Sequence, residues 1–156
     1  IALVIGIILI ILVGGLVFYL RSHLTKTTIC KGKLDIITTE EVEVISSDEK
    51  VKETKTQVTY DYSDYVSDMY PISYYKDYIK NSNKFYKDIN GVKASLKVKG
   101  NKVIYTVDIQ YDSDYMKDLV EAGLVSTNGS YKDIEYISLQ DTLKNQENAG
   151  LTCKEK

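Results

Sequence analysis

Two cysteines are the residues in this chain best suited to covalent chemistry. Cys30 lies in the stretch LTKTTICKGK, and Cys153 lies in GLTCK near the end of the sequence. If the first and last strands of the domain pair, the two sulfurs can meet, and an even cysteine count in an exported domain favours a disulfide. The alternatives are two unpaired thiols in the core and thiol-disulfide redox chemistry through the same pair, although no CxxC motif lowers a thiol pKa. Lipid attachment to Cys30 is disfavoured, because the bulky Ile29 precedes it.

Other catalytic and metal-binding arrangements have few candidate residues. The one histidine, His23, lies next to the apolar start of the chain, so the domain cannot assemble a Ser-His-Asp or Cys-His site. Two cysteines and one histidine do not match structural zinc spacings either. The acidic runs at residues 61–68 and 112–118 lack the glycine and terminal glutamate of an EF-hand, and we read them as helix caps. We therefore predict no catalytic residue, no metal site and no cofactor.

Tyrosine is the third residue type that could form a site. The chain has 14 tyrosines and no tryptophan, and eight of the tyrosines lie between residues 60 and 86. Tyrosine offers a large amphipathic area for contact with a sugar or a protein, but it also commonly covers a sheet. The candidate binding surface consists of Tyr74, Tyr75, Tyr78 and Tyr86.

The start of the chain predicts a membrane anchor. Residues 1–20 contain no charged residue, and twenty helical residues span roughly 30 Å, the thickness of the hydrocarbon core of a bilayer. A cleaved signal peptide is the alternative, but its apolar region is usually about 7 to 15 residues long. We expect one transmembrane helix at 1–20, a polar tether at 21–27, and a segment missing before Ile1.

Residues 28–156 predict one extracytoplasmic domain. All 20 Lys and Arg and all 22 Asp and Glu lie after residue 20, a composition typical of a water-exposed fold. The formal net charge is −2 and there is no basic block, so nucleic-acid binding, which needs clustered Lys and Arg, is not expected.

Alternation of apolar and polar residues predicts strands at 54–62, 92–98 and 103–111, with a tight turn at Gly100 and Asn101. Between the hairpins, residues 68–91 predict a helix with Pro71 in its first turn. The fold class is α+β, an antiparallel sheet of about five to six strands with helices packed on one face. Similar segments at a fifty-residue offset, such as YSDYVSDM and DSDYMKDL, suggest two ββα units.

Three stretches resemble the YehR-like family of bacterial envelope lipoproteins. They are TICKGK, YKDINGVKASLKVKGNKV and YISLQDTLKNQENAGLTCK, and the resemblance extends from about Cys30 to Lys154. It implies an exported α+β domain of unknown activity and carries over no functional residues. The chain departs from the family's lipoproteins in its anchor, because a membrane helix here replaces the acylated cysteine.

Together these features predict a single-pass protein of the bacterial cell membrane. Its domain is expected to be a non-catalytic binding or interaction module, with an envelope protein, peptide or glycan as partner. The alternatives are a redox protein using Cys30 and Cys153 and a small-ligand receptor using the tyrosine-rich helix.

Overall fold

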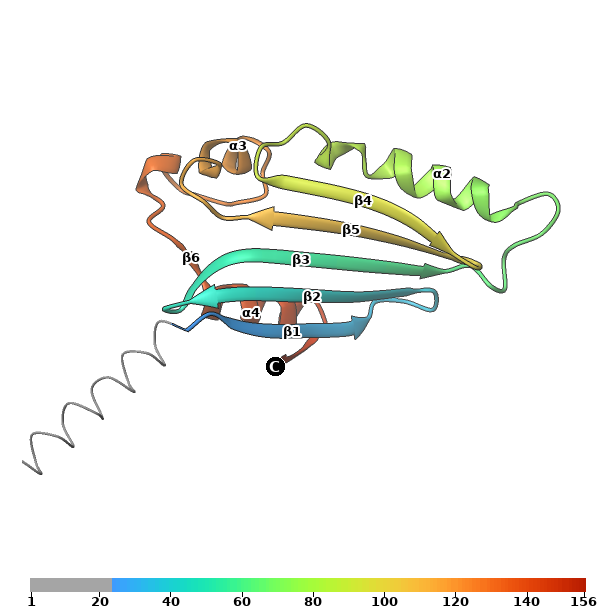
Figure 1. Cartoon of the computed structure of the whole chain (residues 1–156), viewed down its shortest axis with the longest axis horizontal. Coiled ribbons are helices and arrows are strands. Elements are labelled where there is room, and N and C mark those ends of the chain that lie inside the picture. Colours follow the sequence, from blue (N-terminus) through green and yellow to red (C-terminus); the bar gives the residue numbers. More distant parts are fainter. Residues whose placement is uncertain (1–23) are drawn as a thin grey trace, which may run out of the picture.

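The computed structural model describes residues 24–156 (Figure 1). The predicted membrane helix at 1–20 and residues 21–23 of the predicted tether lie outside the described residues. Within residues 24–156, no helix is both long and apolar enough to cross a membrane. The first strand begins at Lys26, so the last two residues assigned to the tether belong to the sheet.

The domain consists of seven strands, three α-helices and two short 3₁₀ turns within the described part of the chain. In chain order these are β1 (Lys26–Lys33), β2 (Thr38–Ser47), β3 (Lys50–Asp61), α2 (Ile72–Ser82), η1 (Lys84–Tyr86), β4 (Val92–Lys99), β5 (Lys102–Gln110), α3 (Met116–Glu121), η2 (Tyr131–Asp133), β6 (Ile137–Ser138), α4 (Leu139–Asn148) and β7 (Thr152–Glu155).

The strands form one antiparallel sheet in the order β4-β5-β3-β2-β1-β7, and β6 pairs with the start of β3. The predicted α+β class with an antiparallel sheet is confirmed, but the predicted five to six strands fall short of seven. The additional strand is β6, which has only two residues and so shows no alternating pattern in the sequence. The origin of the two hairpins and their following helices from a repeated ββα unit stays a prediction.

All three helices pack on the same face of the sheet. The register places Cys30 opposite Val42. Successive cross-strand partners through β3 lead from Val42 to Val107 of β5, so these residues lie on the same face of the sheet. Residues of this face are buried, with Cys30, Val44 and Val103 fully inaccessible. In Figure 1, α4 lies behind β1 to β3, while α2 runs along β4 and β5. The alternation in the sequence therefore predicts which side of the strands faces the helices, although Ala94 and Val98 of β4 are exposed on that side.

Three apolar clusters attach the helices to this face. Leu139 of α4 packs with Val42 and Val44. Ile79 of α2 packs with the β5 residues Val103 and Val107 among others. A third cluster, at α3, consists of Met116, Leu119 and Val125. Burial of a side chain of this size contributes about 1.5 to 3 kcal/mol, so each helix is held mainly by its inward residues.

The opposite face of the sheet carries charged and polar side chains. One row of cross-strand partners reads Glu43, Lys55, Asp108 and Lys93. Near the end of β3, Lys102 Nζ lies 2.7 Å from Asp61 Oδ2. The hydrogen bond from Lys102, followed by those from Ser63, lowers the pKa of Asp61 to about 2. No helix of the described chain packs on this face, because its residues offer little apolar area.

The disulfide between Cys30 and Cys153 joins the first and last strands. The two residues are register partners in the β1–β7 pair, and the S–S distance is 2.02 Å. Both sulfurs belong to the cluster around Val42 and Val44. The predicted disulfide is confirmed, since the terminal strands pair as the sequence predicts.

We expect the disulfide to supply a large part of the stability of the domain. The bond closes a loop of 123 residues, and in the chain-entropy model such a loop contributes about 4 to 5 kcal/mol. The double variant Cys30→Ala/Cys153→Ala should lose about this amount in urea unfolding.

The matched control for this measurement is the reductant. Reduction should destabilise the wild type to a similar extent and leave the double variant unchanged. Equal stability of the oxidised wild type and the double variant would contradict this role for the bond.

Candidate functional site

Helix α2 begins directly after Pro71 and carries three of the four predicted tyrosines, while Tyr86 lies at the end of η1. Proline suits the start of a helix because its missing N–H would have no intrahelical partner there. The helix ends at Ser82, nine residues before the predicted stop at Gly91. At this point Asn83 donates both its backbone N–H and its side-chain amide to Ile79 O, at 3.1 and 2.9 Å. The side chain competes for a helical acceptor, and the chain turns into η1.

The four predicted tyrosines divide into two pairs. Tyr75 and Tyr86 are half-buried and pack on the cluster around Val103. Tyr75 stacks on Tyr62 with ring centroids 4.1 Å apart. Its hydroxyl donates to Tyr65 O at 3.0 Å. These two tyrosines therefore cover the sheet and fix α2 in place. Their role is structural, as expected for tyrosines that cover a sheet, and they do not form a binding surface.

Tyr74 and Tyr78 face solvent, with 52% and 60% of their surface exposed. They are four residues apart and so share one side of α2. The Tyr74 ring also contacts the exposed Tyr70, with centroids 5.2 Å apart. We define the aromatic surface as the exposed residues of this region: Tyr65, Met69, Tyr70, Tyr74 and Tyr78. The binding surface predicted from the sequence did not include Tyr65, Met69 and Tyr70, because these residues precede the helix and follow no periodic pattern.

Three tyrosines that pack beneath α2 have raised pKa values. Burial raises the pKa of Tyr60, Tyr62 and Tyr105 above the usual value of 10, because desolvation disfavours the phenolate. For Tyr60, the carboxylate of Glu40 adds to the effect. The hydroxyl of Tyr105 donates to Asn83 O at 3.2 Å. These neutral phenols act as structural groups between the sheet and α2.

A groove of about 730 Å³ opens between α2, η1 and the edge strand β4. Its floor contains apolar and aromatic side chains, including Val92, Ala94, Leu96 and Tyr105. Four lysines line its helical side, namely Lys76, Lys80, Lys84 and Lys87. The sequence analysis did not predict this groove, because its two walls come from separate segments. The available signal was the four-residue spacing of Lys76, Lys80 and Lys84.

A second groove, of about 710 Å³, lies between the η2 region and α4. It contains the carboxylates of Asp133, Glu135 and Asp141. Asp133 accepts a hydrogen bond from Ser130 N, and the Asp141 N–H donates to Ser138 Oγ at the start of α4. The groove is polar. Asp133 forms part of a capping box at the start of η2, and Ser138 caps α4.

The cysteines offer little access for thiol exchange. Cys30 is fully buried and Cys153 is partly buried, whereas exchange requires a thiolate to approach one of the sulfurs. This geometry favours a structural disulfide over the redox alternative. Among residues 24–156, no group of three or more His, Cys, Asp or Glu side chains is placed to hold a metal ion. His23 lies outside the described residues.

No known family model matches the chain, and no curated protein matches it. Among solved structures, the NMR structure of Escherichia coli YehR is similar, with a TM-score of 0.51 at 12% identity. The similarity covers 82% of this chain and 88% of YehR. The NMR structure of a protein from Streptococcus pneumoniae TIGR4 gives a TM-score of 0.48 at 13% identity, over 84% of both chains. The likeness to YehR shows that the two chains share a fold.

We expect the buried tyrosines to ionise late in an alkaline titration. Their folded-state pKa lies above the unfolded value, so their contribution to stability is present below about pH 10 and is lost as the pH rises further. Tyr62→Phe removes one such phenol and should reduce the late rise in phenolate absorbance. The loss of stability above pH 10 should also become shallower. The urea-unfolded protein, in which tyrosines ionise near pH 10, provides the reference. An unchanged titration curve of the folded variant would contradict this assignment.

Proposed function

We propose that this chain is a membrane-tethered, non-catalytic binding module of the YehR-like family, with its domain outside the cytoplasm. Two observations support the family: the shared fold with YehR and the resemblance of three stretches of the sequence. Support for the location comes from the disulfide, since such bonds persist in oxidising compartments. The charge-free residues 1–20 support the tether.

The observation that carries the binding role is the aromatic surface. Soluble domains rarely expose several large aromatic and apolar side chains side by side without a partner. Tyrosine is well suited to such contacts, because its ring gives apolar area and its hydroxyl gives a hydrogen bond. Met69, which is 77% exposed, adds an adaptable apolar side chain. A peptide, protein or glycan surface is the partner class that this chemistry fits.

We expect fusions to report an extracytoplasmic domain. Alkaline phosphatase, which needs export for activity, should be active when fused after Lys156, and β-galactosidase should be inactive there. Deletion of residues 1–20 should abolish the phosphatase activity, because the domain then loses its export signal. The reverse pattern would place the domain in the cytoplasm and contradict the proposal.

We expect ligands selected on the full chain to depend on the aromatic surface. A glycan array and a displayed peptide library serve as probes. Binders from the productive probe should bind Tyr74→Ser/Tyr78→Ser at least about thirtyfold more weakly, the loss typical of interface hot spots.

Tyr136→Ser is the matched control for this double variant. Tyr136 has a similar exposed fraction, 49%, but lies in the second groove, so its loss should leave binding unchanged. Binders that tolerate the double variant as well as the control, or the absence of any binder, would contradict the role of the aromatic surface.

A further inference from the structure

The edge strand β4 presents unused backbone hydrogen-bonding groups. Gln110 N–H donates to Gly91 O at 2.8 Å, which fixes the phase of hydrogen bonding between β4 and β5. In an antiparallel pair, alternate residues point their backbone groups toward the partner strand. The groups that point to the open edge are those of Ala94, Leu96 and Val98. In the described chain β4 pairs only with β5, so this edge can receive another strand.

The side chains of the same residues lie on the helix side of β4. Ala94 and Leu96 line the groove beneath α2, and Val98 is 38% exposed. An added strand would place every second side chain over this apolar floor. The groove and the free edge therefore form one continuous feature, suited to an extended chain rather than to a compact ligand.

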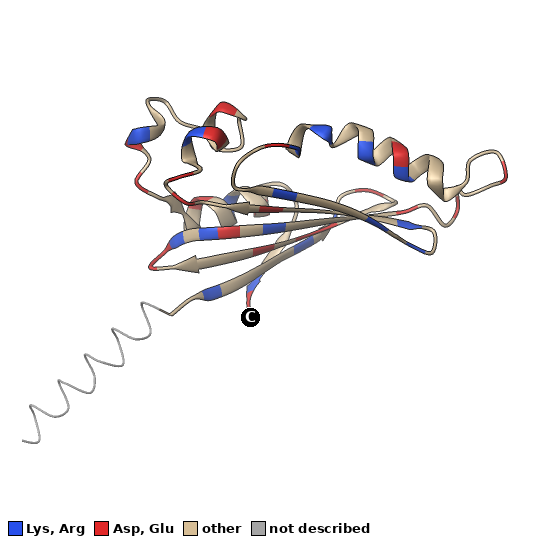
Figure 2. Cartoon of the chain, turned by 45° about the horizontal axis from the view of Figure 1, so that its top comes forward, with Lys and Arg blue, Asp and Glu red and all other residues tan. Residues whose placement is uncertain are grey.

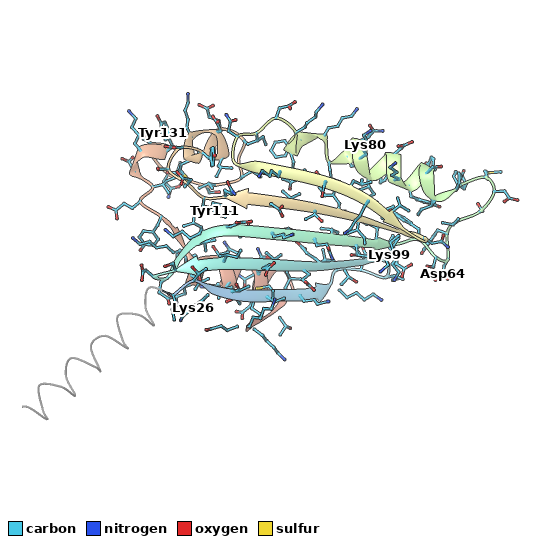
Figure 3. The ribbon with its side chains drawn as sticks, in the orientation of Figure 1. Lys26, Asp64, Lys80, Lys99, Tyr111 and Tyr131 are labelled. Carbon is cyan, nitrogen blue, oxygen red and sulfur yellow. A yellow bond between two sulfur atoms is a disulfide. The ribbon has the colours of Figure 1, made fainter. Side chains whose placement is uncertain are left out.

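Lysines surround this feature on both sides. Lys76, Lys80, Lys84 and Lys87 line the helical wall, while Lys93, Lys97 and Lys99 alternate with the apolar residues on the other face of β4. Figure 2 shows the basic residues on α2 and β4, and Figure 3 shows Lys80 on α2 and Lys99 at the hairpin end of β4. None of these lysines forms an ion pair with a described residue. The carboxylates of Asp77 on α2, of Asp88 after η1 and of Asp108, the cross-strand partner of Lys93, only partly offset this charge.

We propose that the β4 edge binds an extended acidic peptide segment by strand addition. In the bound state, apolar residues of the segment lie over Ala94 and Leu96. Its alternate acidic residues lie beside Lys93 and Lys97. Strand addition supplies affinity through main-chain hydrogen bonds, while the side chains on each face supply specificity. Lysines at an edge disfavour pairing with most strands. An acidic segment is the exception, because its carboxylates form favourable cross-strand pairs with these lysines.

The charge also disfavours the competing occupants. A second copy of this chain paired through β4 would bring the lysines of the two edges together, which is destabilising. A phosphate polymer would satisfy the lysines but would leave the apolar floor and the edge carbonyls without a partner. This surface lies on the opposite side of α2 from Tyr74 and Tyr78, so the proposal is independent of the aromatic surface.

Fluorescence anisotropy with the full chain tests the proposal. The probe is the labelled peptide (Val-Glu)₄-Val, and (Val-Lys)₄-Val is its charge control. The acidic peptide should bind and the basic one should not. The variant Lys93→Glu/Lys97→Glu reverses the charge beside the acidic residues of the bound segment, so it should weaken binding by about tenfold or more and reduce its salt dependence. Lys132→Glu/Lys144→Glu, which changes the same charge on exposed residues elsewhere, should bind as the wild type does.

Backbone methylation separates strand addition from simple charge attraction. N-methylation of all Val residues blocks one edge of the peptide, and N-methylation of all Glu residues blocks the other edge. One pattern should abolish binding and the other should retain it. In NMR spectra, amide exchange should slow at Ala94, Leu96 and Val98, and Tyr74→Ser/Tyr78→Ser should bind the peptide normally.

Three results would overturn the proposal. The first is no binding of the acidic peptide, and the second is equal binding of both methylated peptides. The third is that long-chain polyphosphate binds and slows amide exchange at the same three residues. Because the tyrosine double variant is measured with the same peptide, failure here is distinguishable from failure of the aromatic surface.

Discussion

Successive side chains of a strand point to opposite faces, so each strand of this sheet can bury only alternate residues against helices on one side. The register carries one apolar set from Cys30 through Val42 to Val107. A slip of one residue at any pair would bring a charged set under the helices, where an unpaired charge is costly. The positions of α2, α3 and α4 therefore all depend on this single register. The charged outer face follows from the same constraint.

The two edges of the sheet are protected in different ways. At the β7 edge, the disulfide fixes a short strand of four residues, and Gly32 of β1 permits a close approach. A Cβ on Gly32 would lie 2.8 Å from Leu151 Cδ2 and 2.9 Å from Gly150 O, so a larger residue would push the incoming chain away. At the β4 edge no covalent bond or covering strand is present in the described structure. Lysines instead protect this edge, a common means of opposing unspecific pairing.

The sequence was most informative where one local rule decided the structure. Alternation predicted the strands around Val103 and Val58, where successive side chains point alternately to the two faces of the sheet. It was less informative where tertiary contacts decided. The periodic pattern of α2 continues past Asn83, but a side-chain hydrogen bond ends the helix there. The short β6 exists only because β3 provides a partner at Lys50 and Val51.

The candidate surfaces also depend partly on local sequence and partly on tertiary contacts. Composition drew attention to the tyrosines, yet it could not separate the inward Tyr75 from the outward Tyr78, which are three residues apart. Only the packing on Ile79 decides which side of α2 faces the sheet. Once this stripe is fixed, the helical period sends Tyr74 and Tyr78 to one flank and Lys76 and Lys80 to the other. One helix thus gives an aromatic flank and a basic flank, each next to different neighbours. Because the fold requires only the buried stripe, the residues of both flanks are free to serve binding.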